Sequence, residues 1–268
     1  MSVTPPVLAG VLGALAIAGW APAAVEQVSV RVDGVGCPFC VHGIDTRLNH
    51  LAGVDRTAGI KTSLQKGTSR FTWNAAVEFD PEDVRRAIRD AGFTPRDISV
   101  WVTGTAGRAP ADDSATTLLL TDGKVGPTVI LRPGDQADRR ESWLDLVKLS
   151  ARHEDMRRVR VTGVVRARDG DSSWEIVLGR WAPLEFGALV TVGVDELAGV
   201  QGSMRTMKVL AALDTVIHAE ADHKTDRVEI WMTRTDPDLD TLRERLASVG
   251  CTVTDIRVRQ GSDGDDLD

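Results

Sequence analysis

One short segment occurs twice in this chain and organises the rest of it. Val28-Ser-Val-Arg-Val-Asp33 matches Val190-Thr-Val-Gly-Val-Asp195, and apolar residues downstream then coincide without a gap. These are Leu48 with Leu210, Leu51 with Leu213 and Val54 with Val216. After one change of register, Trp73 falls on Trp231, and Gly92-Phe-Thr-Pro-Arg-Asp-Ile98 falls on Gly250-Cys-Thr-Val-Thr-Asp-Ile256. Such internal similarity predicts that one structural unit is present twice.

The first copy predicts the order strand, helix, strand, strand, helix, strand. Val28, Val30 and Val32 alternate with polar residues, as in a half-buried strand. Residues 68–73 read as the second arm of a hairpin. Apolar residues recur at helical spacing in two places, which are Val41, Ile44, Leu48 and Leu51, and then Val84, Ala87, Ile88 and Ala91.

Helix ends are also marked in the sequence. Asp80 and Pro81 suit the start of the second helix, as N-cap and first-turn residue. We expect Gly53 to end the first helix and Gly92 to end the second. In the second copy an equivalent stripe is formed by Leu239, Leu242, Leu246 and Val249. We therefore predict an α+β protein with two ferredoxin-like βαββαβ domains, at residues 25–100 and 188–260.

The segment between the copies, residues 101–183, has a different pattern. Trp101-Val-Thr-Gly-Thr-Ala106 is echoed by Arg160-Val-Thr-Gly-Val-Val165. Short apolar runs lie between and after them, at 118–120, 128–131 and 174–178, and residues 144–151 suit a short helix. Many short strands with turn signals predict a small β-barrel, and the V-x-G strands resemble an OB-fold. The simplest role for such a barrel is a spacer between the two copies.

The termini suggest export and a polar tail. Val7–Gly19 is an uncharged apolar run followed by Ala21-Pro-Ala-Ala24, so residues 1–24 are expected to be a secretory signal or an anchor. No Lys or Arg precedes the run. We expect a secreted or periplasmic protein, in contact with a membrane only if this segment is not cleaved. Residues 261–268 are acidic with Gly and Ser, and are expected to be disordered.

Composition excludes some classes of function. The chain has 268 residues, 42% hydrophobic and 26% charged, with a net charge of -7 and a pI near 5.3. General nucleic-acid binding requires a basic face, so no nucleic-acid partner is expected. No nucleophile–base set, phosphate loop or carboxylate dyad stands out, and we expect no enzymatic activity.

The chemistry is concentrated in one loop. Three cysteines are present, and Cys37 and Cys40 lie close together in Gly34-Val-Gly-Cys-Pro-Phe-Cys40, between the first strand and the first helix. A helix N-terminus lowers thiol pKa values, and Pro38 suits the first helical turn. Paired thiolates select soft ions, so the pair predicts a site for Cu(I), with Hg(II) or Zn(II) as alternatives.

This loop and its setting resemble the heavy-metal-associated domain family. That family includes copper chaperones, metal-binding modules of copper-transporting P-type ATPases and periplasmic mercury-binding proteins, and its loop reads G-M-x-C-x-x-C. The resemblance covers residues 25–102 and includes the Gly92-Phe93 pair, which the family places facing the metal loop. It implies metal binding by Cys37 and Cys40 and a metal transporter or acceptor protein as partner.

The chain departs from the family in two places. Val35 stands where the family has Met. In the second copy Cys37 and Cys40 fall on Gly199 and Gly202, so this copy resembles a degenerate domain without a site. Cys251, at the counterpart of Phe93, is expected to be a buried small residue.

Two alternatives to metal carriage stay open. Cys37-Pro-Phe-Cys40 also resembles a glutaredoxin-type pair, which predicts a thiol–disulfide redox protein. A third interpretation is a structural or interaction module with a vestigial site. We expect His42, His218 and His223 on the surface, and the tryptophans at 73, 101, 174, 181 and 231 in the core.

Overall fold

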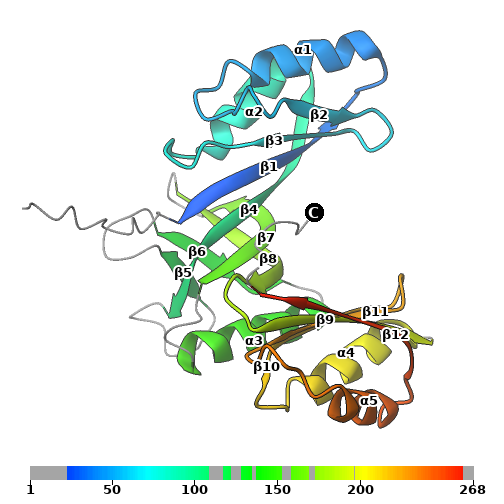
Figure 1. Cartoon of the computed structure of the whole chain (residues 1–268). Coiled ribbons are helices and arrows are strands. Elements are labelled where there is room, and N and C mark those ends of the chain that lie inside the picture. The colour runs from blue at the N-terminus through cyan, green and yellow to red at the C-terminus, as the bar shows by residue number, and fades with distance from the viewer. Residues whose placement is uncertain are drawn as a thin grey trace, which may run out of the picture.

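The computed structural model describes residues 23–108, 117–121, 128–134, 137–152, 158–168, 173–195 and 197–261. Three units follow one another along the chain (Figure 1). A βαββαβ domain comes first, a β-barrel second and another βαββαβ domain third. The predicted signal segment lies outside the described residues except for Ala23 and Ala24, and so does the predicted tail after Gly261. None of the helices in these ranges is long and apolar enough to cross a membrane.

The first domain has two helices on one face of an antiparallel sheet. Its sheet order is β2-β3-β1-β4, so the two central strands are the first and third of the unit. Helices α1 and α2 cover the outer face, and the other face is turned toward the third unit (Figure 1). The elements are β1 Ala24–Asp33, α1 Pro38–Leu48, β2 Ile60–Ser63, β3 Thr68–Thr72, α2 Pro81–Asp90 and β4 Thr94–Arg108.

Helix α2 forms and ends as its sequence predicts. The Asp80 side chain accepts a hydrogen bond from the Glu82 N–H and caps the helix, with Pro81 in the first turn. Val84, Ala87 and Ile88 are buried against the sheet. Gly92 has φ +88, the left-handed conformation that stops a helix at low cost.

Helix α1 ends earlier than predicted. It stops at Leu48 with Asn49 as C-cap, so the expectation that Gly53 ends it was wrong. Gly53 is instead buried under the Trp73 indole, where an added Cβ would lie 2.1 Å from ring atoms. The glycine is needed there because a large ring packs directly on the backbone, and not because a helix stops.

The middle unit is a closed five-stranded barrel. Its strands pair in the ring β4-β5-β6-β8-β7 and back to β4, and only the β6–β8 pairing is parallel. The interior is filled by apolar side chains such as Leu118, Leu131 and Ile176, which are fully buried. The further elements are β5 Leu118–Thr121, β6 Val129–Arg132, α3 Ala137–Arg152, β7 Arg158–Ala167 and β8 Trp174–Pro183.

The third unit repeats the topology of the first. Its sheet order β10-β11-β9-β12 corresponds strand for strand to β2-β3-β1-β4, which confirms the predicted duplication. Its helices lie on the face turned away from the barrel (Figure 1). The elements are β9 Ala188–Asp195, α4 Gly199–Leu210, β10 Val216–Asp222, β11 Arg227–Met232, α5 Leu239–Ala247 and β12 Thr252–Gln260.

Strand β4 belongs to two units at once. Ser99 pairs with Ser29 of β1 on one side and with Val164 of β7 on the other. Trp101 is likewise flanked by Gln27 and Thr162. The sheet of the first domain therefore continues into the barrel wall without a break. In agreement with this, one apolar core runs through both units, whereas most of the third unit's core is separate.

Candidate metal centre

The loop with Cys37 and Cys40 joins β1 to α1, as predicted. Gly34 has φ +88 and turns the chain out of the strand. Cys37 is extended, with φ -144 and ψ 155, and is the N-cap of α1, so Pro38 occupies the first helical position. Cys40 follows in the first turn. The local sequence thus places two sulfur atoms at the N-terminal end of one helix.

The two cysteines are close enough to share one partner. Their Cα atoms are 5.2 Å apart, and in this structure the sulfurs form a disulfide. The Sγ of Cys37 accepts a hydrogen bond from the Cys40 N–H at 3.1 Å, in the manner of an N-cap side chain. When the pair is reduced, that N–H and the helix dipole favour the thiolate form of Cys37.

The loop rests on an apolar base and carries an exposed ring. Phe93 lies below Gly34, where a Cβ would be 3.8 Å from the Phe93 ring, so Gly92-Phe93 faces the loop as expected. Val35 and Phe93 are both partly buried against the core. Phe39, between the two cysteines, is 87% exposed. The loop is therefore supported from below and open on its outer side.

The site offers two protein ligands. No group of three or more His, Cys, Asp or Glu side chains suited to hold a metal occurs within the described ranges. His42 is exposed on α1, as expected. A two-thiolate site suits an ion that accepts linear coordination by sulfur, and an open face leaves room for an incoming third ligand.

The corresponding loop of the second copy has no cysteine. Helix α4 begins at Gly199, with φ +62, and its N-cap residue Ala198 makes no side-chain cap. Cys251 is buried, as expected, and its sulfur lies 3.6 Å from the Thr206 hydroxyl oxygen. The second copy keeps the fold and lacks the chemistry.

One histidine was placed wrongly from the sequence. His218 is not on the surface but is 1% exposed, between the rings of Trp181 and Trp231 at centroid distances of 4.1 and 5.2 Å. Its neighbour Trp181 belongs to the barrel, so the sequence around His218 could not indicate that this side chain is buried. Desolvation lowers the pKa of His218 from 6.5 to about 3, with a smaller effect of Arg180. His218 is therefore neutral, and its Nδ1, 4.0 Å from an Asp145 carboxylate oxygen, forms no ion pair.

The tryptophan expectation was right in part. Trp73, Trp181 and Trp231 are buried. Trp101 and Trp174 are only half-buried. Trp174 packs at the edge of the core, where its ring centroid lies 5.4 Å from that of Phe79.

Comparison with known proteins finds one curated relative with significant similarity. Over 70 residues the chain is 36% identical to human copper-transporting ATPase 2, a match that covers 26% of this chain and 4% of the ATPase. The chain therefore spans only a small part of that protein. No protein-family model matches the chain.

Solved structures with similarity include small metal-binding proteins and tandem domains. A copper-ion-binding protein from Bacillus anthracis is 30% identical, covering 28% of this chain and 99% of that one, with a TM-score of 0.24. Oxidized MerP from Ralstonia metallidurans is 19% identical, covering 27% and 96%, also with a TM-score of 0.24. The N-terminal soluble domains of Bacillus subtilis CopA are 11% identical, covering 87% and 94%, with a TM-score of 0.23.

The sequence likeness to the copper-transporting ATPase agrees with the βαββαβ order and the Cys-x-x-Cys loop of the first domain. The first domain therefore resembles the heavy-metal-associated family in sequence and in the order of its elements.

Proposed function

We propose that the first domain binds one soft metal ion, Cu(I) or Hg(II), through the thiolates of Cys37 and Cys40 and passes it to an acceptor. The observation that carries this proposal is the position of the two sulfurs. Both lie at the N-terminal end of α1, on a loop whose outer side is open. Cu(I) is the first choice, because the curated relative is named for copper transport.

The ligand set argues for a linear two-sulfur complex. Two soft thiolates suit Cu(I) and Hg(II), whereas structural Zn(II) needs four ligands. The described residues offer no further pair beside the loop. A thiolate of an acceptor can add as a third ligand before one protein thiolate leaves, so the ion moves without ever being free. The partner we propose is accordingly a metal transporter or acceptor protein that presents its own cysteines.

The disulfide sets a condition on binding. Reduction takes up two electrons and two protons and yields two thiols. Binding of one cation by both thiolates then releases two protons. An external reductant, such as a small thiol, must supply the electrons, so metal loading depends on the redox state of the compartment.

The same bonded pair supports a second candidate function. Cys37 and Cys40 can act as a thiol–disulfide redox pair that exchanges with a substrate thiol through a mixed disulfide. The hydrogen-bond donors of a helix N-terminus stabilise a thiolate in both functions. The affinity for metal and the rate of thiol–disulfide exchange are measured separately, so the two candidate functions can be distinguished.

The remaining units are proposed to be non-enzymatic and structural. Along the chain α3 lies between β6 and β7, and in the ring the third and fifth strands of the barrel are parallel. This arrangement supports our proposal that the barrel is OB-like. We propose that it spaces the outer domains and that the ligand-free third unit is a docking or structural module. An extracytoplasmic location, with the N-terminal segment as signal or anchor, belongs to the same proposal.

A Cu(I) competition titration tests the metal function. The reduced chain is titrated against a chromophoric Cu(I) chelator, and one ion is expected to bind per chain. The Cys37→Ser/Cys40→Ser variant is expected to lose this binding, whereas Cys251→Ser, which removes the buried lone thiol, is expected to retain it. Unchanged affinity in the double variant contradicts the proposal. If binding is absent in the parent and the pair exchanges rapidly with a thiol buffer, the redox function is supported instead.

A further inference from the structure

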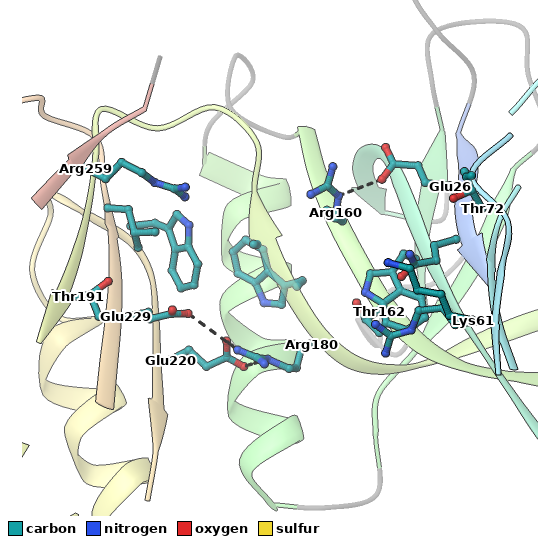
Figure 2. Close-up of a pocket in the computed structure, with 18 of the residues that line it drawn as sticks. Glu26, Lys61, Thr72, Arg160, Thr162, Arg180, Thr191, Glu220, Glu229 and Arg259 are labelled. Carbon is teal, nitrogen blue, oxygen red and sulfur yellow. Dashed lines mark hydrogen bonds and ion pairs between the residues drawn. The ribbon is translucent and has the colours of Figure 1, made fainter. Parts of the chain in front are cut away.

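A large cleft lies between the first and third units, away from the cysteine loop. It has a volume of about 970 Å³. One wall is the helix-free face of the first sheet together with the outer barrel wall, and the other is the helix-free face of the third unit's sheet (Figure 2). In each copy one face of the sheet is not covered by helices, and these two faces lie opposite each other.

The strand register defines the first wall. One row of side chains crosses five neighbouring strands, because each member pairs with the next, and all of them line the cleft. The row is Thr72, Gln27, Trp101, Thr162 and Arg180. Most of it is neutral and rich in hydrogen-bonding groups, with one half-buried aromatic ring.

The acidic residues of the cleft are paired with arginines. Arg180 of β8 donates to both carboxylate oxygens of Glu220 on β10 and lies 3.9 Å from Glu229 on β11 (Figure 2). Desolvation and the neighbouring Glu220 raise the pKa of Glu229. On the first wall, Arg160 pairs with Glu26 at 3.0 Å. All three carboxylates of the cleft are thus occupied by arginines.

The open part of the first wall carries uncompensated positive charge. Lys61 of β2 and Arg70 of β3 are exposed and directly opposite each other, an arrangement of like charges that weakens a sheet. Within the described part of the chain, neither forms an ion pair with a carboxylate. The Arg70 guanidinium lies over the Trp101 ring, 4.9 Å from its centroid. Cross-strand cations without a counter-charge indicate a surface built for an anion.

The opposite wall carries two arginines beside Glu220 and Glu229. Arg257 and Arg259 of β12 line it, and Arg257 is bound to Asp255 of its own strand. In total the cleft is lined by six basic and three acidic residues, although the whole chain has a net charge of -7. Positive charge is therefore concentrated where two walls face each other, which focuses the field on an anion between them.

We propose that this cleft binds an extended acidic peptide segment of a partner protein. Arginines bind carboxylates with paired hydrogen bonds, and the neutral row on the first wall suits the amide groups of a peptide. A single-stranded nucleic acid fits less well, because it needs a series of stacking rings. Here Trp101 is the ring that is only half-buried, and Arg70 already covers it, whereas Trp181 and Trp231 are buried.

The test measures binding of a fluorescein-labelled peptide of alternating Asp and Ser residues to the full chain. Fluorescence anisotropy is expected to show binding that weakens when ionic strength rises from about 50 to about 300 mM. The same peptide with Asn in place of Asp is expected not to bind. The Lys61→Glu/Arg70→Glu variant is expected to bind at least about tenfold more weakly, since two charge contacts are reversed.

A matched variant controls for net charge. Arg47→Glu/Arg86→Glu makes the same charge change on exposed residues of α1 and α2, which cover the other face of the sheet, and should bind as the parent does. Cys37→Ser/Cys40→Ser should also bind as the parent, because the cleft does not use the metal loop. Equal affinity of the cleft variant and the parent overturns the proposal. So does tighter binding of an oligothymidylate than of the acidic peptide, which would assign the cleft to nucleic acid.

Discussion

The two copies of the βαββαβ unit share a topology and differ in chemistry and attachment. The first has Cys37 and Cys40 in its loop and a core that continues into the barrel. The second has Gly199 and Gly202 there and a core that is mostly its own. The fold depends on the apolar pattern, which both copies keep. The cysteine loop can therefore be present or absent without a change in the topology of the sheet beneath it.

The largest effect is expected when the two cysteines are transferred to the second copy. Gly199→Cys/Gly202→Cys, placed in the Cys37→Ser/Cys40→Ser background, puts cysteines at the matching positions of the second copy. We expect Cu(I) affinity about tenfold or more below that of the parent, because Gly199 is in the left-handed region and a side chain there costs about 1–2 kcal/mol before any ion binds. In addition, Gly199 is the first helical residue, whereas Cys37 is the N-cap.

The graft is read out by the same chelator competition. Affinity equal to that of the parent would mean that two cysteines alone make the site. The backbone of the first loop would then contribute nothing.

The second largest expected effect concerns the residue that packs under Trp73, at which the two copies differ. Gly53 of the first copy corresponds to Thr215 of the second. Gly53→Ala should lower the free energy of unfolding by about 3 kcal/mol, because the new Cβ overlaps the Trp73 ring and the core must shift. Urea unfolding followed by tryptophan fluorescence measures it. A loss below about 0.5 kcal/mol would show that the loop moves aside easily.

The burial of His218 between the barrel and the second copy predicts that the stability of the fold depends on pH. The pKa of His218 is about 3 in the folded chain and ordinarily 6.5, so unfolding takes up a proton below pH 6.5. Stability is fully present above that pH and is lost progressively toward pH 3, with a loss of about 2 kcal/mol by pH 5. The groups facing His218 are Asp145, Arg180 and the two tryptophan rings.

The control is His218→Phe, which keeps a ring in the stack and removes the titration. Urea unfolding of both proteins at pH 7 and pH 5 should show a smaller loss in the variant, by about 2 kcal/mol. An identical loss in both would locate the pH dependence elsewhere.

The smallest expected effect concerns a helix position at which the first copy has glycine and the second copy has a side chain. Gly43 in the middle of α1 corresponds to Arg205 of α4, and a Cβ at Gly43 would meet nothing within 4 Å. Gly43→Ala should raise the free energy of unfolding by about 0.5–1 kcal/mol through helix propensity alone. The same urea experiment applies. A lower free energy of unfolding in Gly43→Ala would contradict this prediction. It would indicate that a glycine at this position of α1 stabilises the fold.

Local patterns predicted most of the fold. The repeat predicted both βαββαβ units, and Asp80, Pro81 and Gly92 marked the ends of α2 correctly because caps act through neighbours in sequence. Helix α3 runs from Ala137 to Arg152, longer than the predicted 144–151. Its first turns are polar, so the apolar pattern did not extend into them.

Contacts between residues far apart in the sequence could not be predicted from local patterns. Gly53 resembled a helix stop, since nothing in its neighbourhood indicates that a ring twenty residues later lies on it. His218 is buried by Trp181 from another unit, and Lys61 and Arg70 became notable only when two sheet faces were seen to oppose each other. The cysteine pair was found because its residues are adjacent. Its role as a metal site stays a prediction.

Strand β4 has a consequence for how this chain can be divided. It passes through the predicted boundary between residues 100 and 101 while paired on both sides. A fragment cut there would expose the backbone of β1 at one edge and of β7 at the other, and unprotected edges favour aggregation. The first domain and the barrel are therefore expected to be exchanged, inherited or expressed as one piece, whereas the third unit, whose core is mostly its own, is the more separable part of the protein.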